Sequence, residues 1–493
     1  MRKPNILFLL ADDQRFDMIG ALGHPDVLTP NLDRLVERGT FFKEAHIPGG
    51  TVGAVCMPSR AMLHTGRTLF HIHDDGRTIP DEHVMLGEWL REAGYCTFGT
   101  GKWHNGGRAF NRSFQDGAEL FMGGMEDHWN VPAFRYDPSG AYDKTQPFIR
   151  DPMYTKRVEQ RWCDHVHAGV HSTDLFSGTA VDWLRRCDSE QPFFLYVSYM
   201  APHDPRSMPH KYRQMYDVSA LTLPKNFAPE HCFDYGVRDI RDERLAPYPR
   251  TEADIREQLA DYYAMITHLD DRLGDVLETL REIGQEDNTI VVFAGDNGLA
   301  VGQHGLMGKQ SCYEHSVRVP LVFAGPGVPR GTQRDDYVYL SDIFPTLCEL
   351  SGLPVPTSVE GVSLAPLFFG SAVKDSQSAE DGHPDYSGRG QHHLSILHGR
   401  ERIFLAYADL VRAVKERHYK LIVYQDPSAS QLFDLRKDPM ECQNLYGQPS
   451  LNAVARSMLE KLVLHSVSSG DREHPAGRKF WNSRMKDTIT PDQ

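Results

Sequence analysis

Five short apolar stretches recur along this chain, and they restrict its possible folds more than any other feature of the sequence. Each is rich in Val, Ile, Leu and Phe, and none alternates regularly between apolar and polar residues. Strands buried on both faces of a parallel sheet have this composition, whereas half-exposed strands alternate. We therefore predict buried parallel strands at residues 5–11, 95–100, 192–199, 289–294 and 319–324.

Helical patterns lie between these stretches. One begins at Thr29-Pro30 and ends at Gly39, and others cover residues 84–93, 174–186 and 252–283. Thr before Pro is a common helix start, and Gly is a common helix stop. The alternation of strands and helices predicts an α/β fold, in which a large, mostly parallel or mixed sheet is flanked by helices on both faces.

A chain of 493 residues is too long for one small core, so we expect a large domain with a smaller one attached. Residues 370–393 are polar and rich in Gly, Ser and Asp, which predicts a linker or loop. Strand-like runs and one helical pattern follow it, at residues 402–408, 419–424, 431–435 and 450–465. We predict an N-terminal domain at residues 1–370 and a C-terminal antiparallel α+β subdomain at residues 371–493.

Residues 105–170 break the strand–helix alternation. They are rich in Gly, aromatic residues and His, and they predict an excursion of long loops. Such loops can be a plain surface insertion or the wall of a substrate pocket, because long ordered loops are often functional. The sequence leaves both interpretations open.

The composition excludes several classes of protein. A net charge of -14 argues against nonspecific nucleic-acid binding. The apolar run at residues 6–11 is too short to span a bilayer, so no membrane association is expected. The eight cysteines form no C-x-x-C pair and indicate reduced thiols. No signal-peptide cleavage pattern follows the first strand, so we expect a cytoplasmic protein if the sequence is native, and a periplasmic or secreted one if a leader was removed. The oligomeric state is not indicated.

Polar residues follow four of the predicted strands directly. They are Asp12-Asp13, Lys102 with His104, His203, and Asp296-Asn297. A single aspartate at a strand end is usually a turn former or a helix cap. In an open parallel sheet, however, sites form beyond the carboxyl ends of the strands, so these four groups are expected to meet in one pocket.

Four of these strand-end residues carry hard oxygen donors. Asp12, Asp13, Asp296 and Asn297 suit Ca²⁺, or less favourably Mg²⁺, and no zinc-type cluster of Cys and His accompanies them. Three carboxylates packed together would repel one another without a cation. Composition alone leaves both interpretations open, a metal site and ordinary turns.

The segment that starts at Cys56 reads Cys-Met-Pro-Ser-Arg-Ala-Met-Leu-His-Thr-Gly. Pro58 can occupy the first turn of a helix, and Gly66 can end it. Cys56 would then lie at a helix N-terminus, where the macrodipole favours anions and a thiolate would be reactive. A buried core cysteine is disfavoured by this polar context.

This segment resembles the C-x-P-S-R-x-x-x-x-T-G motif of the type I (formylglycine-dependent) sulfatase family, within the alkaline phosphatase-like superfamily. The opening strand with its aspartate pair is similar to the family's first metal-binding strand. The resemblance covers most of the chain and is weak at residues 105–170 and 214–250, where substrate choice would be encoded. Further similar blocks are Gly101-Lys102-Trp103-His104, Gly295 to Gly298, His304-Gly305, Lys309, Tyr313-Glu314, Arg318 to Pro320 and residues 432–445.

The resemblance implies a sulfuric ester hydrolase whose catalytic domain is residues 1–370. Cys56 would be converted to formylglycine by a transiently bound maturation enzyme, and its hydrate would attack sulfur. Residue 56 would also bind Ca²⁺ together with Asp12, Asp13, Asp296 and Asn297.

The resemblance also implies roles for the basic residues. Arg60 would steady the hydrate and the metal carboxylates, and His104 would be the base that expels sulfate. Lys102 and Lys309 would neutralise the sulfate oxygens, and His203 would be the general acid. Alone, Lys102 would more often be a surface lysine and His203 a structural histidine. For His304, substrate contact and a plain loop turn stay equally open.

Three functions remain after this reading. The first is hydrolysis of a sulfate monoester, with a sulfated carbohydrate as the expected substrate at the level of the family. The second is hydrolysis of phosphonate monoesters or phosphodiesters, because enzymes of that kind resemble sulfatases and can use the same formylglycine. The third is carbohydrate binding without catalysis, which the intact set of motif residues disfavours.

Overall fold

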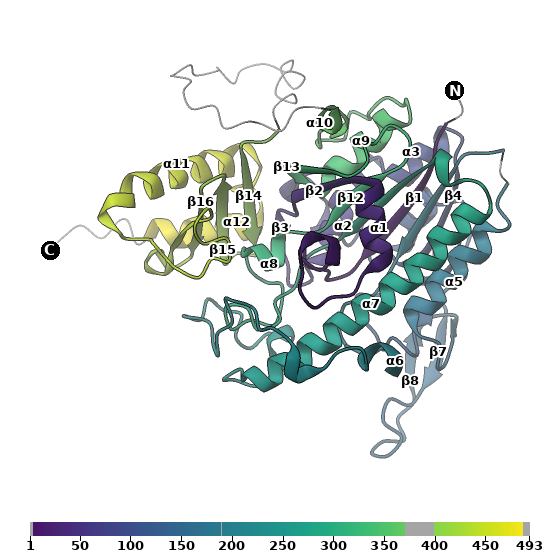
Figure 1. Cartoon of the computed structure of the whole chain (residues 1–493), viewed down its shortest axis with the longest axis horizontal. Helices are drawn as coiled ribbons and strands as arrows, with labels where there is room; N and C mark the ends of the chain where they lie inside the picture. Colours follow the sequence, from purple (N-terminus) through teal and green to yellow (C-terminus); the bar gives the residue numbers. More distant parts are fainter. Residues whose placement is uncertain (1–2, 189, 370–398, 487–493) are drawn as a thin grey trace.

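The computed structural model describes residues 3–188, 190–369 and 399–486. The chain forms a large α/β unit and a smaller C-terminal unit built on its own sheet, at the left of Figure 1. The predicted linker at residues 370–393 lies outside the described residues, and so does the predicted boundary between residues 370 and 371.

Within the described residues, the larger sheet has eight strands in the order β13-β2-β12-β11-β1-β10-β4-β5. The central strands β11, β1, β10 and β4 are parallel to one another, which confirms a mostly parallel sheet. The strands, in chain order, are β1 (Asn5–Ala11), β2 (Gly39–His46), β4 (Cys96–Lys102), β5 (Asp116–Phe121), β10 (Phe193–Ser198), β11 (Thr289–Gly295), β12 (Leu321–Ala324) and β13 (Thr332–Tyr339).

The prediction of a parallel strand at residues 319–324 is wrong in its direction. β12 is antiparallel to both of its neighbours, β11 and β2. The segment between β11 and β12 contains only the short helix α8 (Glu314–Val317) and no crossover helix. Because the chain is not carried back to the start of the sheet, β12 enters from the end where β11 finishes and runs in the opposite direction.

Three strands of the larger sheet were not predicted. β5 and β13 carry charged residues, and they form the two edges of the sheet, where charge is tolerated and protects against edge-to-edge pairing. β2 begins at Gly39, directly after helix α1, so this glycine starts a strand as well as ending a helix.

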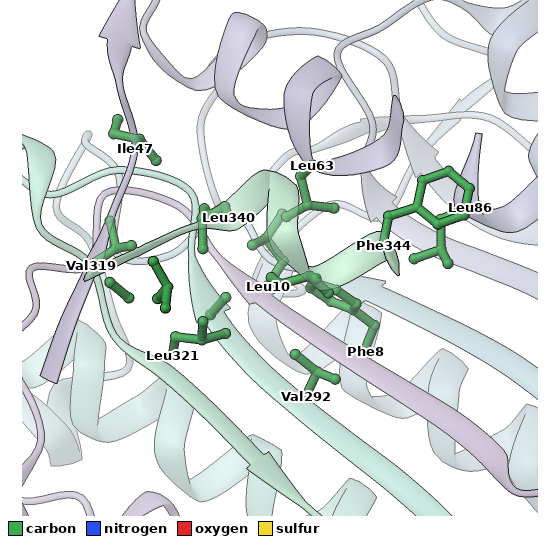
Figure 2. Packing of buried hydrophobic residues seen from close by; sticks show 14 of the residues in the cluster. Phe8, Leu10, Ile47, Leu63, Leu86, Val292, Val319, Leu321, Leu340 and Phe344 are labelled. Atoms are coloured by element: carbon green, nitrogen blue, oxygen red, sulfur yellow. The ribbon is translucent and has the colours of Figure 1, made fainter. Parts of the chain in front are cut away.

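Helices cover both faces of the larger sheet, as predicted. Leu7 and Leu9 of β1 pack in one core cluster with residues of α1 (Pro30–Arg38), α5 (Ser172–Leu184) and α7 (Glu252–Glu282). Phe8 and Leu10 pack on the opposite face with α2 (Cys56–Thr65), α3 (Leu86–Glu92), α4 (Gly107–Ser113) and α9 (Ile343–Leu350) (Figure 2). The non-alternating apolar strands follow from this burial of both faces.

The C-terminal unit is a small, mostly antiparallel sheet with helices, as predicted. Its order is β17-β16-β15-β14-β3, and α11 packs against it. β3 (Gly49–Gly50) comes from the N-terminal part of the chain and pairs with β14 a few residues before Cys56. The other elements are β14 (Arg402–Tyr407), β15 (Val411–Glu416), β16 (Tyr419–Tyr424), β17 (Gln431–Asp434), α11 (Asn452–Ser468) and α12 (Pro475–Lys486); β15 and α12 were not predicted.

The excursion at residues 105–170 holds more regular structure than predicted. Besides α4 and β5, it forms two short antiparallel pairs. One pair is β6 (Pro132–Ala133) with β9 (His165–Val166), and the other is β7 (Thr145–Phe148) with β8 (Glu159–Trp162). The remaining short helices are α6 (His210–Arg213) and α10 (Ala365–Phe369). No helix in the described part of the chain is both long and apolar enough to span a bilayer.

Candidate active site

The four polar strand ends meet at the carboxyl edge of the larger sheet. The strands that carry them, β11, β1, β10 and β4, are consecutive in the sheet order. The contact between Asp13 and Asp296 illustrates the result: the backbone nitrogen of Asp13 donates to Asp296 Oδ1 at 3.2 Å across 283 positions of sequence. Asp13 and His104 have positive φ angles of 66° and 77°, a backbone strain that often accompanies functional sites.

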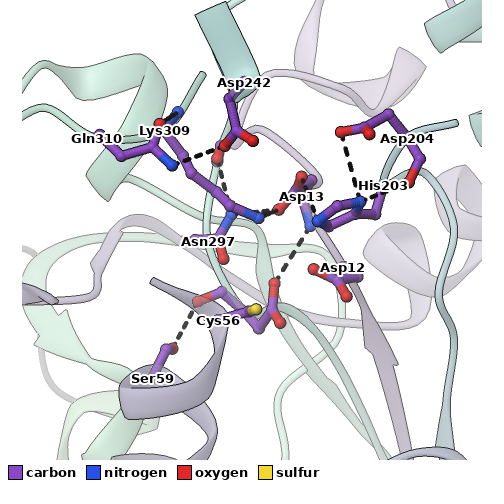
Figure 3. A network of polar contacts seen from close by, with 12 residues as sticks. Asp12, Asp13, Cys56, Ser59, His203, Asp204, Asp242, Asn297, Lys309 and Gln310 are labelled. Carbon is purple, nitrogen blue, oxygen red and sulfur yellow. Dashed lines mark hydrogen bonds and ion pairs between the residues drawn. The ribbon is translucent and has the colours of Figure 1, made fainter. Parts of the chain in front are cut away.

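Helix α2 presents Cys56 to this edge. The helix begins at Cys56 itself, so Pro58 is its third residue and lies in the first turn, as predicted. Gly66 ends the helix in the left-handed conformation, with a φ angle of 64°. The Oγ of Ser59 donates to the backbone oxygen of Asp296 at 2.5 Å and fastens the first turn to the end of β11 (Figure 3).

Two basic groups flank the sulfur of Cys56. Lys102 Nζ lies 3.6 Å from Sγ, and His104 Nδ1 lies 3.4 Å from it. Burial nevertheless raises the pKa of the Cys56 thiol, and the effect of Lys102 and Lys309 does not overcome it. Removal from water thus opposes the helix terminus and the nearby ammonium groups and disfavours the thiolate form of Cys56.

The carboxylates beside Cys56 are short of partners. Asp12 Oδ1, Asp13 Oδ2 and Asn297 Oδ1 are buried and have no hydrogen-bond partner within the described chain. Ligand atoms of Asp12, Cys56 and Asp296 lie within 4.8 Å of one another. Burial and the charge of Asp12 raise the pKa of Asp296 to about 6. This arrangement of unpartnered oxygens fits a hard divalent cation.

Arg60 binds two of these carboxylates, those of Asp12 and Asp296. Its Nε donates to Asp296 Oδ2 at 2.8 Å, and one Nη lies 3.6 Å from Asp12 Oδ2. The other Nη donates to the backbone oxygen of Lys102 and to Ser198 Oγ, at 2.9 and 2.6 Å. Arg60 is fully buried and joins the ends of four strands, β1, β4, β10 and β11.

Two lysines compensate the aspartate pair. Lys102 Nζ pairs with Asp12 and Lys309 Nζ with Asp13. Burial alone would raise the pKa of Asp12, but Lys102, followed by His203 and Arg60, lowers it well below its usual range. Burial alone would lower the pKa of Lys309, yet Asp13 raises it well above its usual value. Lys309 is therefore charged at neutral pH.

The two histidines differ in environment. Burial, followed by the charge of Lys102, lowers the pKa of His104 well below its usual range, so this ring is neutral at pH 7. His203 Nδ1 lies 2.7 Å from the backbone oxygen of Asp204, which can only accept. His203 therefore carries a hydrogen on Nδ1 and turns Nε2 toward Asp13, 3.7 Å from Oδ2.

A cavity of about 300 Å³ opens over these groups. The cavity is lined by Cys56, His104, His203 and Lys309. Lys102 and Arg60 are fully buried and are not among its lining residues. A larger cavity of about 690 Å³, lined by residues such as Tyr339 and Leu405, contains none of the predicted site residues. The converging charged groups, and not cavity size, identify the smaller one as the candidate active site.

Comparison with known protein families agrees with this geometry. A family model described as Sulfatase matches residues 4–353, which include every predicted site residue. The chain belongs to the sulfatase family. A second model, described as N-sulphoglucosamine sulphohydrolase, C-terminal, matches residues 405–467 of the smaller unit of this sulfatase. The resemblance to sulfatases within the alkaline phosphatase-like superfamily is thus confirmed, and the protein is a sulfuric ester hydrolase.

Individual relatives extend the comparison over the whole chain. The ulvan-active sulfatase of Formosa agariphila is 28% identical over 487 residues, or 95% of this chain and 82% of its own. A protein solved in complex with its substrate D-glucosamine-2-N,6-O-disulfate has a TM-score of 0.69 and 20% identity, covering 97% of this chain and 100% of its own. The phosphonate monoester hydrolase of Agrobacterium radiobacter has a TM-score of 0.68 and 22% identity, covering 95% and 96%.

The two stretches of weak resemblance both reach the cavity of this sulfatase. Gly124 and Met125 come from the excursion at residues 105–170, and Ile240, Arg241 and Asp242 come from residues 214–250. The excursion therefore forms part of the pocket wall, which decides between its two interpretations. Neither wall could be identified residue by residue, because these segments carry no motif.

Other residues at the site were also missed. Gln310 Nε2 donates to Asp242 Oδ2 at 2.6 Å, and Tyr407 reaches the cavity from the C-terminal sheet. The position of Gln310 directly after Lys309 was the only available signal. His304 stacks on Tyr313, with 4.0 Å between the ring centres, and is not among the residues that line the cavity in the described chain.

Proposed function

We propose that this sulfatase hydrolyses a sulfate monoester of a saccharide, with residue 56 matured to formylglycine and Ca²⁺ held by Asp12, Asp13, Asp296 and Asn297. One observation carries the proposal. Three unpartnered oxygens lie beside Cys56, and the cationic groups Lys102, Lys309 and Arg60 surround the same point. The site is therefore suited to a metal and to an anionic ester at once.

When bound, a cation held by Asp12, Asp13, Asp296 and Asn297 would acidify a hydroxyl on residue 56 and polarise the sulfate, and residue 56 matured to formylglycine would supply that hydroxyl. The chain prepares this site. Arg60 fixes the Asp12 and Asp296 carboxylates, and Lys102 and Lys309 neutralise negative charge around the sulfate. Asp296, with its raised pKa of about 6, is suited to take up a proton from the nucleophile.

The histidines divide the remaining proton transfers between them. His104 is neutral and lies 3.4 Å from the side-chain atom of residue 56, so it can accept a proton there. His203 lines the cavity. Its Nδ1 is held by the backbone oxygen of Asp204, so Nε2 is the nitrogen that is left for proton transfer. We assign His203 as the general acid that protonates the leaving alcohol, with Lys309 beside it.

A saccharide is the proposed substrate class for two reasons. The relative bound to D-glucosamine-2-N,6-O-disulfate shares the fold, and the smaller unit matches a model described as N-sulphoglucosamine sulphohydrolase, C-terminal. The cavity also combines the apolar surfaces of Met125 and Tyr407 with the polar groups of Arg241 and Asp242. Such a mixture suits the polar edges and apolar faces of a sugar ring.

Two measurements test the proposal. The mass of the peptide around position 56 should show loss of sulfur and gain of oxygen. Sulfated saccharides of defined linkage should then be hydrolysed with higher kcat/KM than an aryl phosphonate or an aryl phosphodiester. Preference for a phosphorus ester would favour the phosphonate hydrolase alternative, which shares the same fold. If Cys56 is unmodified and the protein binds saccharides without hydrolysing them, the alternative of carbohydrate binding without catalysis would be favoured.

A further inference from the structure

A cluster of two histidines and one glutamate lies in the excursion, among residues that do not line the active-site cavity. His165 Nε2 is 2.7 Å from Glu119 Oε2, and His167 Nε2 is 3.1 Å from the same oxygen. The three ligand atoms all lie within 4.8 Å of one another. Two strands provide them, since Glu119 belongs to β5 while His165 begins β9 and His167 follows it.

A local irregularity of the backbone sets the direction of the Glu119 side chain. The register between β4 and β5 passes from Ala118 to Leu120 in one step, so Glu119 is the extra residue of a β-bulge. Its φ angle is 53°, a conformation that a glutamate rarely adopts. Bulges of this kind redirect a side chain, and here the carboxylate points at the two imidazoles.

Ordinary hydrogen bonding leaves one of these ligand atoms unexplained. His165 Nε2 makes a hydrogen bond with Glu119, but His167 Nε2 is buried and has no hydrogen-bond partner within the described ranges, although the carboxylate is 3.1 Å away. Atoms that approach one another without a donor–acceptor alignment converge on a common point. An ion at that point would satisfy all three.

Asp164 supplies the support that metal-bound histidines usually have. Its Oδ1 accepts from His165 Nδ1, while its Oδ2 accepts from the backbone nitrogen of Arg135 at 3.1 Å. With Nδ1 donating to a carboxylate, a neutral His165 has its lone pair on Nε2, and an ion bound there would take the place of the hydrogen that Nε2 otherwise shares with Glu119. Carboxylate–histidine–metal arrangements of this type fix the tautomer and the ring orientation.

We propose that Glu119, His165 and His167 form a second metal site for a divalent transition-metal ion of the zinc type. Two imidazole nitrogens and one carboxylate oxygen suit Zn²⁺ and its neighbours, whereas Ca²⁺ requires a shell of six to eight oxygens. The His167 side chain is 42% exposed, so the site lies near solvent although Nε2 itself is buried. This site is independent of the proposed function at Cys56.

The position of the site gives the ion a role in holding the pocket wall. The ion would fasten β9 to β5, and β5 leads directly to Gly124 and Met125 at the cavity. The chain after His167 returns to the same wall, since the Gly169 nitrogen donates to the Trp129 oxygen at 2.8 Å. The segment that carries Gly124 and Met125 is thus held at one end by β5 and at the other by the contact of Trp129 with Gly169, both close in sequence to the proposed metal ligands.

The test is Zn²⁺ titration by calorimetry of the full chain carrying Cys56→Ala, with calcium present in excess. This background removes the thiol, which could otherwise bind zinc beside His104. We expect one equivalent of Zn²⁺ to bind. His167→Ala should abolish the binding, and Asp164→Asn should weaken it by ~10–100-fold, the usual effect of changing a carboxylate that orients a metal-bound histidine. His210→Ala, an exposed histidine elsewhere, should bind as the parent does.

Folding and ligand identity are controlled in the same series. Thermal melts without zinc should give the same Tm for the parent and for Asp164→Asn, which keeps a hydrogen-bond acceptor for His165. Co²⁺ in the same background should give ligand-field absorption that disappears in His167→Ala. Absence of Zn²⁺ uptake by the parent, equal uptake by His167→Ala, or equal loss in His210→Ala would overturn the proposal.

Discussion

Lys102 Nζ lies 3.6 Å from the sulfur of Cys56 and pairs at the same time with the carboxylate of Asp12. The lysine ends β4, the cysteine begins α2 and the aspartate follows β1, so three elements place one ammonium group between the Cys56 sulfur and the Asp12 carboxylate. This ammonium does not make Cys56 a thiolate, because burial still raises the pKa of the thiol. The unmodified cysteine is therefore a poor nucleophile, which is consistent with a need for maturation.

The nucleophile can be tested by Cys56→Ala. We expect turnover to fall to less than a few per cent of the parent, because the role proposed for residue 56 is that of the covalent nucleophile, while Tm changes little. Cys442→Ala is the matched control, since Cys442 is an exposed free cysteine, and it should retain full activity. Substantial activity in Cys56→Ala would exclude residue 56 as the nucleophile.

The metal can be tested by chelation. Removal of calcium should lower kcat/KM by ~10²-fold or more, because a cation stabilises several kcal/mol of charge in the transition state. Removal should also lower Tm, because an ion that binds only the folded chain stabilises it, and because Lys102, Lys309 and Arg60 are then the only positive groups paired with Asp12, Asp13 and Asp296 in the described site. Calcium content, activity and Tm should recover together on adding calcium back.

Asp12→Ala provides the control for chelation. This variant should contain little calcium, and its Tm should no longer respond to the chelator. A Tm response of the same size as that of the parent would place the stabilising calcium elsewhere in the protein.

The general acid can be tested by its dependence on the leaving group. A sugar alkoxide needs a proton when it leaves, whereas an activated phenolate does not. The loss of kcat/KM in His203→Ala should therefore be ~10²-fold larger for a sulfated saccharide than for nitrophenyl sulfate. Lys309→Ala should lower kcat/KM for both substrates, because Lys309 neutralises charge next to Asp13. Equal losses for His203→Ala on the two substrates would transfer the role of acid to Lys309.

Substrate choice can be tested at Arg241, which lines the cavity and pairs with Asp204. Arg241→Ala should raise KM for a sulfated saccharide by ~10-fold, the scale of one charge-assisted hydrogen bond, and change nitrophenyl sulfate hydrolysis much less. Arg238→Ala is the matched control, because Arg238 pairs with Glu230 and does not line the cavity. Equal changes in KM for the two variants would show that Arg241 does not contact the saccharide.

Several features followed from the sequence because they are local. Continuous apolar runs require burial on both faces, so β1, β4, β10 and β11 could be predicted, and with them the polar residues at their ends. The start of α2 near Cys56 and its end at Gly66 are likewise set by neighbouring residues. The motif around Cys56 then indicated the family.

Only the tertiary structure decided the direction of β12, the residues of the pocket wall and the burial of Cys56. Each depends on contacts between segments far apart in the sequence, such as the pair formed by Arg241 and Asp204 or that of Lys309 and Asp13. The free energy of such contacts is set by strand order and by exclusion of water, which no local pattern encodes. The bulge that turns Glu119 toward His165 and His167 arises in the same way, from register against a neighbouring strand.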